Sequence, residues 1–173
     1  MKKLLLGLFL LFPLCGFAQK GMQGIGVNCG LGVNFKDDFT LNLNLNYQKH
    51  LSNRFRLSSS LGLYYVEEWY SYSYDYYGYG YYDGHYYYSF YCLITADAHY
   101  FFNQPRRLRP YALGGLFFGL GDGINSSVVG GVKLGLGLTY RLGYHWAMNL
   151  EAPLYLAVPA GSFLPTLGLT YTF

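Results

Sequence analysis

The chain has 173 residues, of which 12% are charged and 21% are aromatic, and its formal net charge at pH 7 is +3. Two of the basic residues, Lys2 and Lys3, lie in an export segment, so the rest of the chain is nearly neutral and gives no argument for a nucleic-acid partner. After that segment no apolar run reaches the ~18 residues that a helical membrane span requires, which excludes a helical membrane protein.

Residues 1–18 have the features of a secretory signal peptide. A basic start precedes the apolar stretch Leu4–Phe12, and residues 16–18 place small side chains at the two positions that a signal peptidase reads. We expect cleavage after Ala18, which leaves 19–173 as the mature chain. Cys15 raises the alternative of a lipoprotein signal, but Leu14 stands where such a signal needs a small residue.

The stretch Phe39–Lys49 alternates apolar and polar residues and predicts a β-strand. Its leucines fall on odd positions and its asparagines on even ones, and successive side chains of a strand point to opposite faces. A soluble protein would turn the leucines into its core, whereas a membrane barrel would turn them to lipid and fill its interior with the amides. We expect Phe35 to pair with Phe39, which sets small glycines of the preceding strand against these amides.

The same alternation recurs along the chain and predicts an all-β fold, an eight-stranded antiparallel transmembrane up-and-down β-barrel. The strands are long enough to cross a bilayer, for which ~9–11 tilted residues suffice. The fifth strand is apolar on both faces, so its inward face stays undetermined. One register slip is expected near Ile94 and one bulge at Pro153, because proline cannot donate to a ladder. The predicted strands are Gly21–Phe35, Phe39–Lys49, Phe55–Trp69, Tyr88–Phe102, Arg109–Gly121, Val128–Leu142, His145–Leu156 and Ser162–Phe173.

Aromatic residues gather at both ends of the predicted strands. Two aromatic girdles around an aliphatic band are typical of a barrel in lipid, and a soluble sandwich has no reason to place them so. Cys29 and Cys92 fall on outward faces of strands that are not neighbours, which predicts free thiols even in an oxidising compartment. The periplasmic girdle comprises Tyr47, Phe55, Tyr100, Phe102, Tyr111, Tyr140, Trp146, Tyr171 and Phe173, and the outer girdle Phe35, Phe39, Tyr65, Trp69, Tyr88, Phe90 and Phe163.

The last predicted strand ends in an aromatic residue that follows an alternating apolar row. Leu167, Leu169, Tyr171 and Phe173 look like the assembly signal of outer-membrane β-barrel proteins, and the mature chain resembles the small eight-stranded barrels of the OmpA/OmpX type. This resemblance implies a bacterial outer-membrane location with periplasmic termini and insertion by the barrel-assembly machinery. It further implies contact with outer-membrane lipid and lipopolysaccharide, a monomer, and no cofactor.

Six ionisable residues fall on predicted inward faces, where a charge must be paired because burying it alone is costly. An eight-stranded barrel is just wide enough for side chains to fill it, so paired charges would plug the lumen. The alternative is a gated or proton-sensitive path that uses a histidine next to an aspartate. The predicted lumen network comprises Arg56, Asp97, His99, Lys133, Arg141 and Glu151.

A tyrosine-rich segment, 70–87, is predicted to form a long extracellular loop. Tyrosine joins a rigid apolar ring to a hydroxyl group and suits recognition surfaces, so we expect a glycan or a surface protein as its ligand. The alternative is low-complexity drift in an unconstrained loop, with the tyrosines extending a hairpin above the membrane. The candidate contact residues are Tyr72, Tyr74, Tyr76, Tyr77, Tyr79, Tyr81, Tyr82 and Tyr86.

Neither a metal site nor an enzyme is predicted. The acidic residues of the outer end match no calcium loop in their spacing, and Gly-x-Ser-x-Gly, His-Glu-x-x-His and phosphate-loop motifs do not occur. The first functional hypothesis is a structural or surface-interaction protein that acts through 70–87, and the second is a small channel for small or apolar solutes. A lipid-modifying enzyme is third. The acids are Asp37, Asp38, Glu67, Glu68, Asp75, Asp83 and Asp122, and Arg54, Arg106, Arg107 and Arg109 lie at the opposite end.

Overall fold

The computed structural model describes residues 21–34, 39–76, 79–103, 107–122, 128–157 and 161–173, and within 68–87 it describes the backbone alone. The predicted signal peptide and Phe35 lie outside the described residues. Among the described residues no helix has the length and apolar character needed to cross a membrane. The strands are β1 (Gln23–Asn34), β2 (Phe39–His50), β3 (Phe55–Tyr76), β4 (Tyr79–Phe101), β5 (Leu108–Gly121), β6 (Val128–Arg141), β7 (Trp146–Ala157), β8 (Gly161–Phe163) and β9 (Thr166–Thr172).

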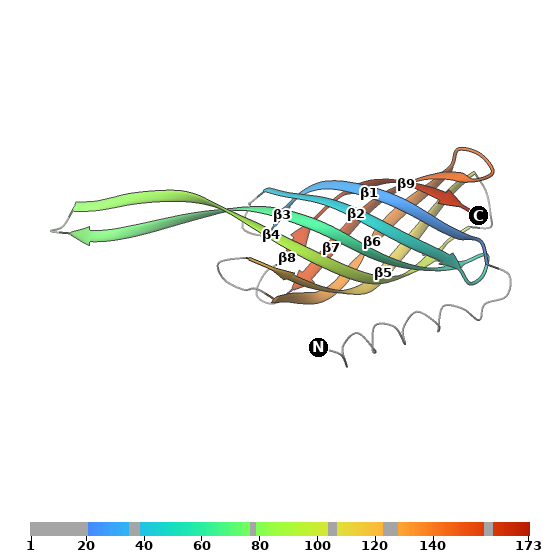
Figure 1. Ribbon diagram of the computed structural model, residues 1–173, viewed down its shortest axis with the longest axis horizontal. Helices are drawn as coiled ribbons and strands as arrows, with labels where there is room; N and C mark the ends of the chain where they lie inside the picture. The colour runs from blue at the N-terminus through green and yellow to red at the C-terminus, as the bar shows by residue number, and fades with distance from the viewer. Residues whose placement is uncertain (1–20, 35–38, 77–78, 104–106, 123–127, 158–160) are drawn as a thin grey trace.

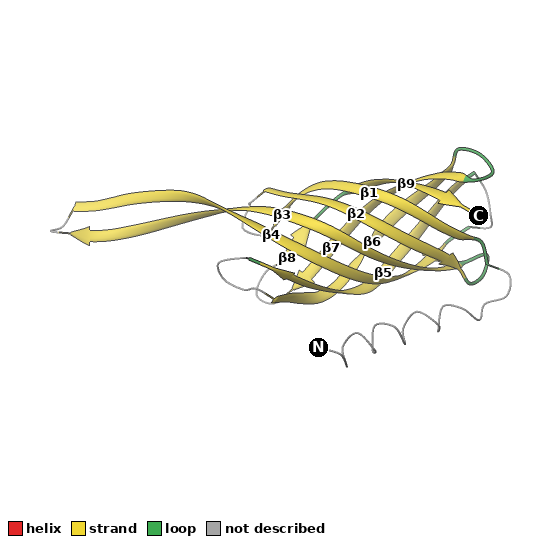
Figure 2. Ribbon diagram, in the orientation of Figure 1, coloured by secondary structure: helices red, strands yellow, loops and turns green. Residues whose placement is uncertain are grey.

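These strands form a closed antiparallel barrel (Figures 1 and 2). From β1 to β7 each strand pairs with the next in sequence, and β1 closes the sheet by pairing with β2 on one side and with β8 and β9 on the other. β8 and β9 together make one barrel strand, because both keep the same register against β7, with Leu154 opposite Phe163 and Glu151 opposite Thr166. The predicted eight-stranded up-and-down barrel is therefore confirmed.

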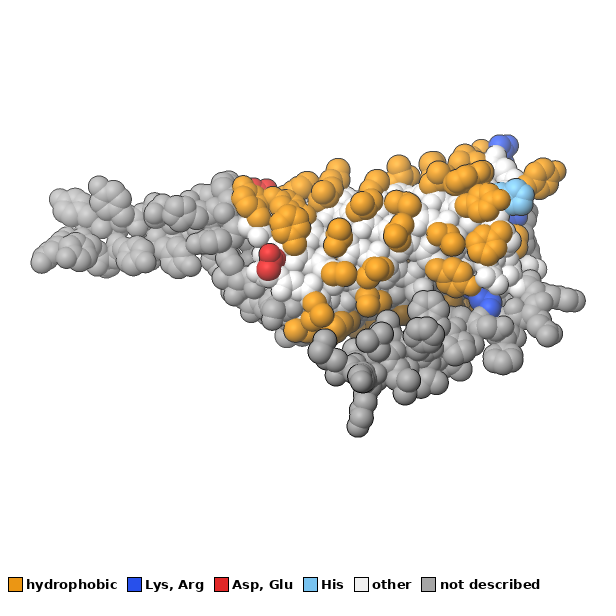
Figure 3. Space-filling model, in the orientation of Figure 1, with side chains coloured by type: hydrophobic (Ala, Val, Ile, Leu, Met, Phe, Trp, Pro, Cys, Tyr) orange, Lys and Arg blue, Asp and Glu red, His pale blue; other side chains and the backbone are white. Residues whose placement is uncertain are grey.

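The leucine-bearing faces point outward and the amide-bearing faces point into the barrel. In β2, Asn42 is 1% exposed and Leu45 is 61% exposed. Figure 3 shows hydrophobic side chains distributed over the whole visible wall rather than collected in one patch. Soluble monomers rarely expose so large an apolar surface, whereas a barrel in lipid requires it. The membrane reading of the alternation is the one that the structure supports.

The first hairpin has the predicted faces but a different register. Val33, not Phe35, pairs with Phe39, so the pairing is shifted by two residues from the expected one. A shift of two preserves the inward and outward faces, since side chains alternate with a period of two. Large amides still meet glycines in this hairpin: Gly30 now pairs with Asn42, and a Cβ atom built on Gly30 would lie 2.6 Å from Oδ1 of Asn42.

The structure settles the orientation of β5 and corrects one girdle residue. Tyr111 and Phe117 are buried in the barrel, and Leu116 and Phe118 are exposed on the wall. Tyr111 was expected in the lipid-facing periplasmic girdle, but its side chain is 0% exposed and lies in the lumen. The inward orientation of Tyr111 could not be predicted from the sequence of β5, because glycine and apolar residues occupy both of its faces.

Two expected irregularities are absent from the described strands. β4 pairs with β3 and β5 without a skipped residue, so no register slip occurs near Ile94. Pro153 pairs in line with Gly135 and causes no bulge in β7. The missing N–H of Pro153 affects the pairing with β8 and β9 instead. The carbonyl oxygen of Pro153 accepts a hydrogen bond from the Leu164 amide (3.1 Å), but proline has no N–H to donate in return, and the strand is interrupted there between β8 and β9.

The segment 70–87 is not a loop but a continuation of β3 and β4. These strands stay paired out to Tyr76 and Tyr79, whereas β2 and β5 pair with them only as far as Val66 and Tyr91. A two-stranded extension, here called the tyrosine ribbon (67–76 and 79–88), therefore leaves the barrel (Figure 1). Tyrosine favours strands and alternates with serine and aspartate over 70–76, so the period of two continues where a loop was expected.

The two ends of the barrel differ. The short connections at 51–54 and 142–145 lie at the end that carries the C-terminus, opposite the tyrosine ribbon (Figure 1). Because short turns face the periplasm in outer-membrane barrels, we call this end the periplasmic mouth. In Figure 3 basic side chains appear at this mouth and acidic ones near the ribbon. Cys29 and Cys92 are free and exposed on the wall, as predicted.

Candidate functional site

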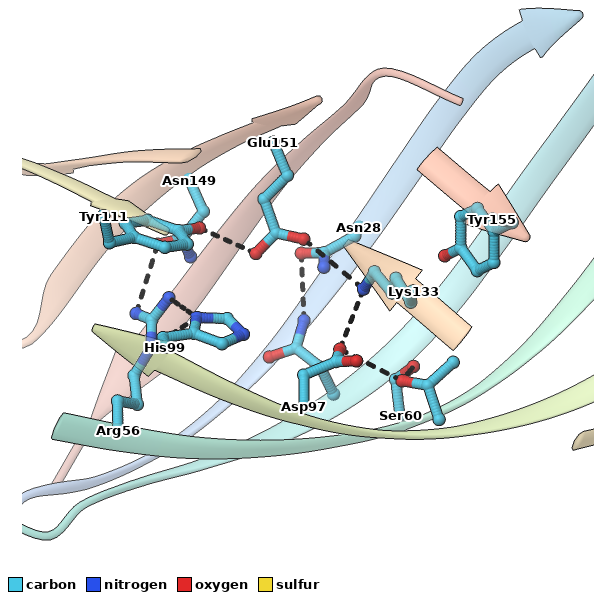
Figure 4. A network of polar contacts seen from close by, with 12 residues as sticks. Asn28, Arg56, Ser60, Asp97, His99, Tyr111, Lys133, Asn149, Glu151 and Tyr155 are labelled. Carbon is cyan, nitrogen blue, oxygen red and sulfur yellow. Dashed lines mark hydrogen bonds and ion pairs between the residues drawn. The ribbon is translucent and has the colours of Figure 1, made fainter. Parts of the chain in front are cut away.

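An ion cluster occupies the middle of the lumen (Figure 4). Nζ of Lys133, from β6, lies 2.8 Å from Oδ2 of Asp97 on β4 and 3.8 Å from Oε2 of Glu151 on β7. All three side chains are almost completely buried. Burial of separate charges would be costly, so the lysine and its two carboxylates, from three strands of the wall, stabilise one another.

Neutral donors add one hydrogen bond to each carboxylate, whereas Oδ1 of Asp97 has no hydrogen-bond partner among the described residues. The Thr95 hydroxyl donates to Asp97 (3.2 Å) and is itself 2.8 Å from the Ser60 hydroxyl. The Tyr111 hydroxyl donates to Oε1 of Glu151 at 2.7 Å. The cluster thus holds two acids and one base, with hydroxyl groups supplying the hydrogen bonds that the single lysine cannot give.

A second layer surrounds Arg56, nearer the periplasmic mouth. Its guanidinium nitrogens lie 3.2 and 2.6 Å from Nδ1 of His99 and 3.5 Å from oxygens of Thr139 and Asn149. Since Arg56 can only donate, Nδ1 of His99 accepts, which assigns the proton of the neutral imidazole to Nε2. The guanidinium carbon also lies 4.9 Å from the centroid of the Tyr111 ring. Arg56 is therefore held by neutral acceptors and an aromatic face.

Tyr111 joins the two layers. It donates to Glu151, stacks on the His99 ring at a centroid distance of 4.8 Å, and lies under Arg56. The structure thus brings five of the six predicted lumen residues into one connected network. The sixth, Arg141, is half-buried at the periplasmic mouth, away from the ion cluster. Tyr111 itself was missed, because the inward face of β5 could not be identified.

An aromatic layer fills the lumen towards the outer end. The hydroxyls of Tyr64 and Tyr155 lie 2.7 Å apart, and the Phe117 ring meets the Tyr155 ring edge-on. Leu93 and Leu164 pack in the same buried cluster. Sequence reasoning missed this layer, although Tyr64 and Tyr155 share the inward parity of the predicted lumen residues on their own strands. Only charged residues were considered for the predicted lumen network, so this parity was not used.

The predicted ligand-contact tyrosines lie along the tyrosine ribbon, apart from the lumen network. Their side chains are not described, and Tyr77 lies outside the described residues altogether. The backbone register places Tyr74 opposite Tyr81 and Tyr76 opposite Tyr79. The described backbone of these residues lies on a ribbon rather than on a loop, and their role in ligand contact stays a prediction.

The predicted assembly signal forms the lipid-facing side of β9. Leu167, Leu169, Tyr171 and Phe173 are all exposed on the wall. Tyr171 packs edge-on against Trp146 at a centroid distance of 5.1 Å, which makes part of the periplasmic aromatic girdle. The alternation is as expected; its role in assembly stays a prediction. Within the described residues no group of three or more histidine, cysteine or acidic side chains is placed to hold a metal ion.

Fold, wall and lumen together define a small eight-stranded outer-membrane β-barrel, with its lipid-facing wall in the bacterial outer membrane. No family model and no curated protein matches the sequence. The solved structures with the same fold include the N-terminal barrel domain of Pseudomonas aeruginosa OprF, at 19% identity over 89% of this chain and 100% of that one, with a TM-score of 0.60.

Two further structures share this fold at lower identity. Ail, the attachment invasion locus protein of Yersinia pestis, was solved with the heparin analogue sucrose octasulfate and is 13% identical, over 90% of this chain and 100% of that one, with a TM-score of 0.58. The outer-membrane enzyme PagL is 16% identical, over 84% of this chain and 98% of that one, with a TM-score of 0.51. At such identities the likeness shows the fold and assigns no activity.

Proposed function

We propose that this outer-membrane barrel is a surface-interaction protein that contacts a glycan or a surface protein through the tyrosine ribbon. The observation that carries the proposal is the continued pairing of β3 and β4 beyond their barrel neighbours. The stretch Glu67–Tyr76 spans roughly 30 Å at about 3.4 Å per residue. A paired ribbon of that length holds its tyrosines well outside the membrane, where a partner can reach them.

The composition of the ribbon supports a contact role. Tyrosine provides a large apolar ring and a hydroxyl group, and only two side-chain torsions must be ordered on binding. The backbone of the ribbon is already paired strand to strand, which lowers the ordering cost relative to a free loop of the same length. Both features favour binding by a surface that needs little rearrangement.

The two outer edges of the ribbon add a second means of contact. Beyond Val66 in β3 and before Tyr91 in β4, the two strands pair only with each other among the described strands. Each strand of the ribbon therefore has one edge with no strand beside it. Unpaired edge N–H and C=O groups accept an additional strand from an extended peptide. A surface protein with an extended segment therefore fits the ribbon as well as a glycan does.

The test is a binding screen of the folded barrel, with and without the ribbon, against glycans and surface proteins. Sulfated sugars belong in the screen because a barrel of the same fold was solved with a heparin analogue. Replacing 72–86 by a short turn should abolish binding while leaving heat-modifiable folding intact. Substituting Tyr74 and Tyr76 by serine should weaken it, and Tyr144→Ser, fully exposed at the opposite end, is the matched control. Binding that survives removal of the ribbon would refute the proposal.

The polar lumen supports a second candidate, a small channel. The Lys133–Asp97 contact, at 2.8 Å, joins β6 to β4 within the filled lumen, and this filling would have to open for a solute to pass. Steady single-channel openings of purified protein in planar bilayers would favour this channel over the surface role. We propose no catalytic role for this protein. Formation of a product when the protein is incubated with labelled lipopolysaccharide or phospholipid would instead indicate a lipid-modifying enzyme.

A further inference from the structure

The periplasmic mouth contains a small pocket lined by basic side chains. The pocket has a volume of about 30 Å³, and its lining includes three arginines and two histidines but no carboxylate side chain. The arginines come from β3, β5 and β6, so residues distant in sequence meet here because the barrel closes. These basic residues are Arg56, Arg109, Arg141, His50 and His145.

The arginines of this pocket have no carboxylate partner within the described part of the chain. Arg109 is 2% exposed; its Nη2 donates to the backbone oxygen of Asn53, whereas its Nε has no hydrogen-bond partner. It lies within Coulombic reach of both Arg141 and Arg56. The ion pairs described for the lumen all use Lys133. Three like charges therefore line one pocket, and two of them, Arg56 and Arg109, are on almost completely buried side chains.

Among the described residues no carboxylate forms an ion pair with these arginines. Like charges held close in a partly dry site repel strongly, and an anion placed between them turns that repulsion into attraction. The planar guanidinium group presents paired donors that match the oxygens of a phosphate group. Arg109 lines the pocket, and because its buried Nε has no hydrogen-bond partner, this guanidinium group has an unused donor.

The level of the pocket relative to the membrane indicates which anion it can bind. Trp146 lines the pocket and is also half-exposed on the lipid-facing wall, where it packs against Tyr171 in the periplasmic girdle. Aromatic girdles mark the level of the lipid headgroups. The pocket therefore lies at the level of the inner-leaflet phosphates, and its small volume fits one such group rather than a whole headgroup.

We propose that the periplasmic mouth binds a single phosphate group, held by Arg109 and Arg141 with Arg56 behind them. The group belongs either to a phospholipid headgroup or to free phosphate, which share this chemistry. The site is independent of the tyrosine ribbon, which lies at the opposite end of the barrel (Figure 1).

The test titrates the folded barrel, extracted from outer membranes into a maltoside detergent in chloride buffer. One arm adds sodium phosphate at constant ionic strength, and the other adds a short-chain phosphatidylglycerol below its micelle concentration. Calorimetry measures affinity. Saturable binding should weaken about tenfold or more in Arg109→Gln and Arg141→Gln, the loss expected for one charge-assisted hydrogen bond. Arg54→Gln, an exposed arginine in a turn at the same end, is the control and should bind normally.

Each outcome decides the proposal. Saturation by both ligands or by one supports the site, and the tighter ligand identifies the source of the phosphate. No saturation in either arm, or an equal response to added chloride, overturns it. An equal loss in Arg54→Gln also overturns it, because it would mean that general surface charge governs binding. Heat-modifiable mobility on gels reports folding, and if Arg109→Gln does not fold, the half-buried Arg141 decides the result.

Discussion

Replacing Lys133 by methionine should destabilise the barrel through charge rather than through lost packing. Methionine keeps most of the length of the lysine stem, but it leaves Asp97 and Glu151 buried without their cation. At about 4 Å and an effective dielectric constant of about 20, one such attraction is worth about 4 kcal/mol before the desolvation of the lysine is subtracted. Breaking a buried ion pair by removing one partner costs about 3–5 kcal/mol, and we expect a loss of that size.

The assay is equilibrium urea unfolding in lipid vesicles, followed by the fluorescence of the two tryptophans in the sequence. The matched control is the triple variant Lys133→Met, Asp97→Asn, Glu151→Gln, in which no charge is left unpaired. Replacement of a whole buried cluster by neutral residues is often nearly neutral for stability, so the triple variant should recover most of the loss. A triple variant as unstable as the single one would show that shape, not charge, explains the effect.

Three further predictions concern the wall, the glycines and the cysteines. Leu43→Lys places a charge on the lipid-facing side near the middle of β2 and should cost about 2–4 kcal/mol in the same urea assay. Gly115→Ala should destabilise the barrel by about 1–3 kcal/mol, because its Cβ would meet the Ala96 carbonyl oxygen at 2.3 Å, while Gly143→Ala, with nothing within 4 Å, should be neutral. Cys29 and Cys92 should both react with maleimide after unfolding without reductant, and unreactive thiols would indicate a disulfide.

The two-residue alternation of side chains predicted most of the fold, because one face of every strand in the barrel wall meets lipid and the other meets the lumen. Asn42 and Asn44 had to face inward once Leu41 and Leu43 faced lipid, and no tertiary detail was needed to say so. Even the two-residue error in the first hairpin left these faces unchanged. The inward and outward faces stayed undetermined only in β5, where the sequence carries no polar side chain between Tyr111 and Gly121 to mark the lumen.

Contacts across the lumen were beyond the reach of the sequence. Parity tells which residues point inward, but partners such as Arg56 and Asn149 meet only because the stagger of the closed sheet brings β3 and β7 to one level. The same stagger places Arg141 at the mouth rather than beside Glu151. The segment 70–87 was expected to be a loop because of its length and composition, although its alternation is that of a strand; the paired backbone matches the alternative, in which the tyrosines extend a hairpin above the membrane.

The filling of the barrel restricts where function can lie. The layer around Tyr64 and Tyr155, the ion cluster and the layer around Arg56 occupy the lumen at successive levels, and lipid covers the wall. Aqueous partners therefore reach this protein at its two ends, which differ in shape and charge: a projecting ribbon outside and a basic pocket at the periplasmic mouth. Because a closed, internally bonded barrel separates them, removing the ribbon should leave phosphate binding unchanged, and neutralising Arg141 should leave ribbon binding unchanged. Loss of both activities in either variant would mean that the barrel transmits change between its ends, which a lumen filled by paired charges should prevent.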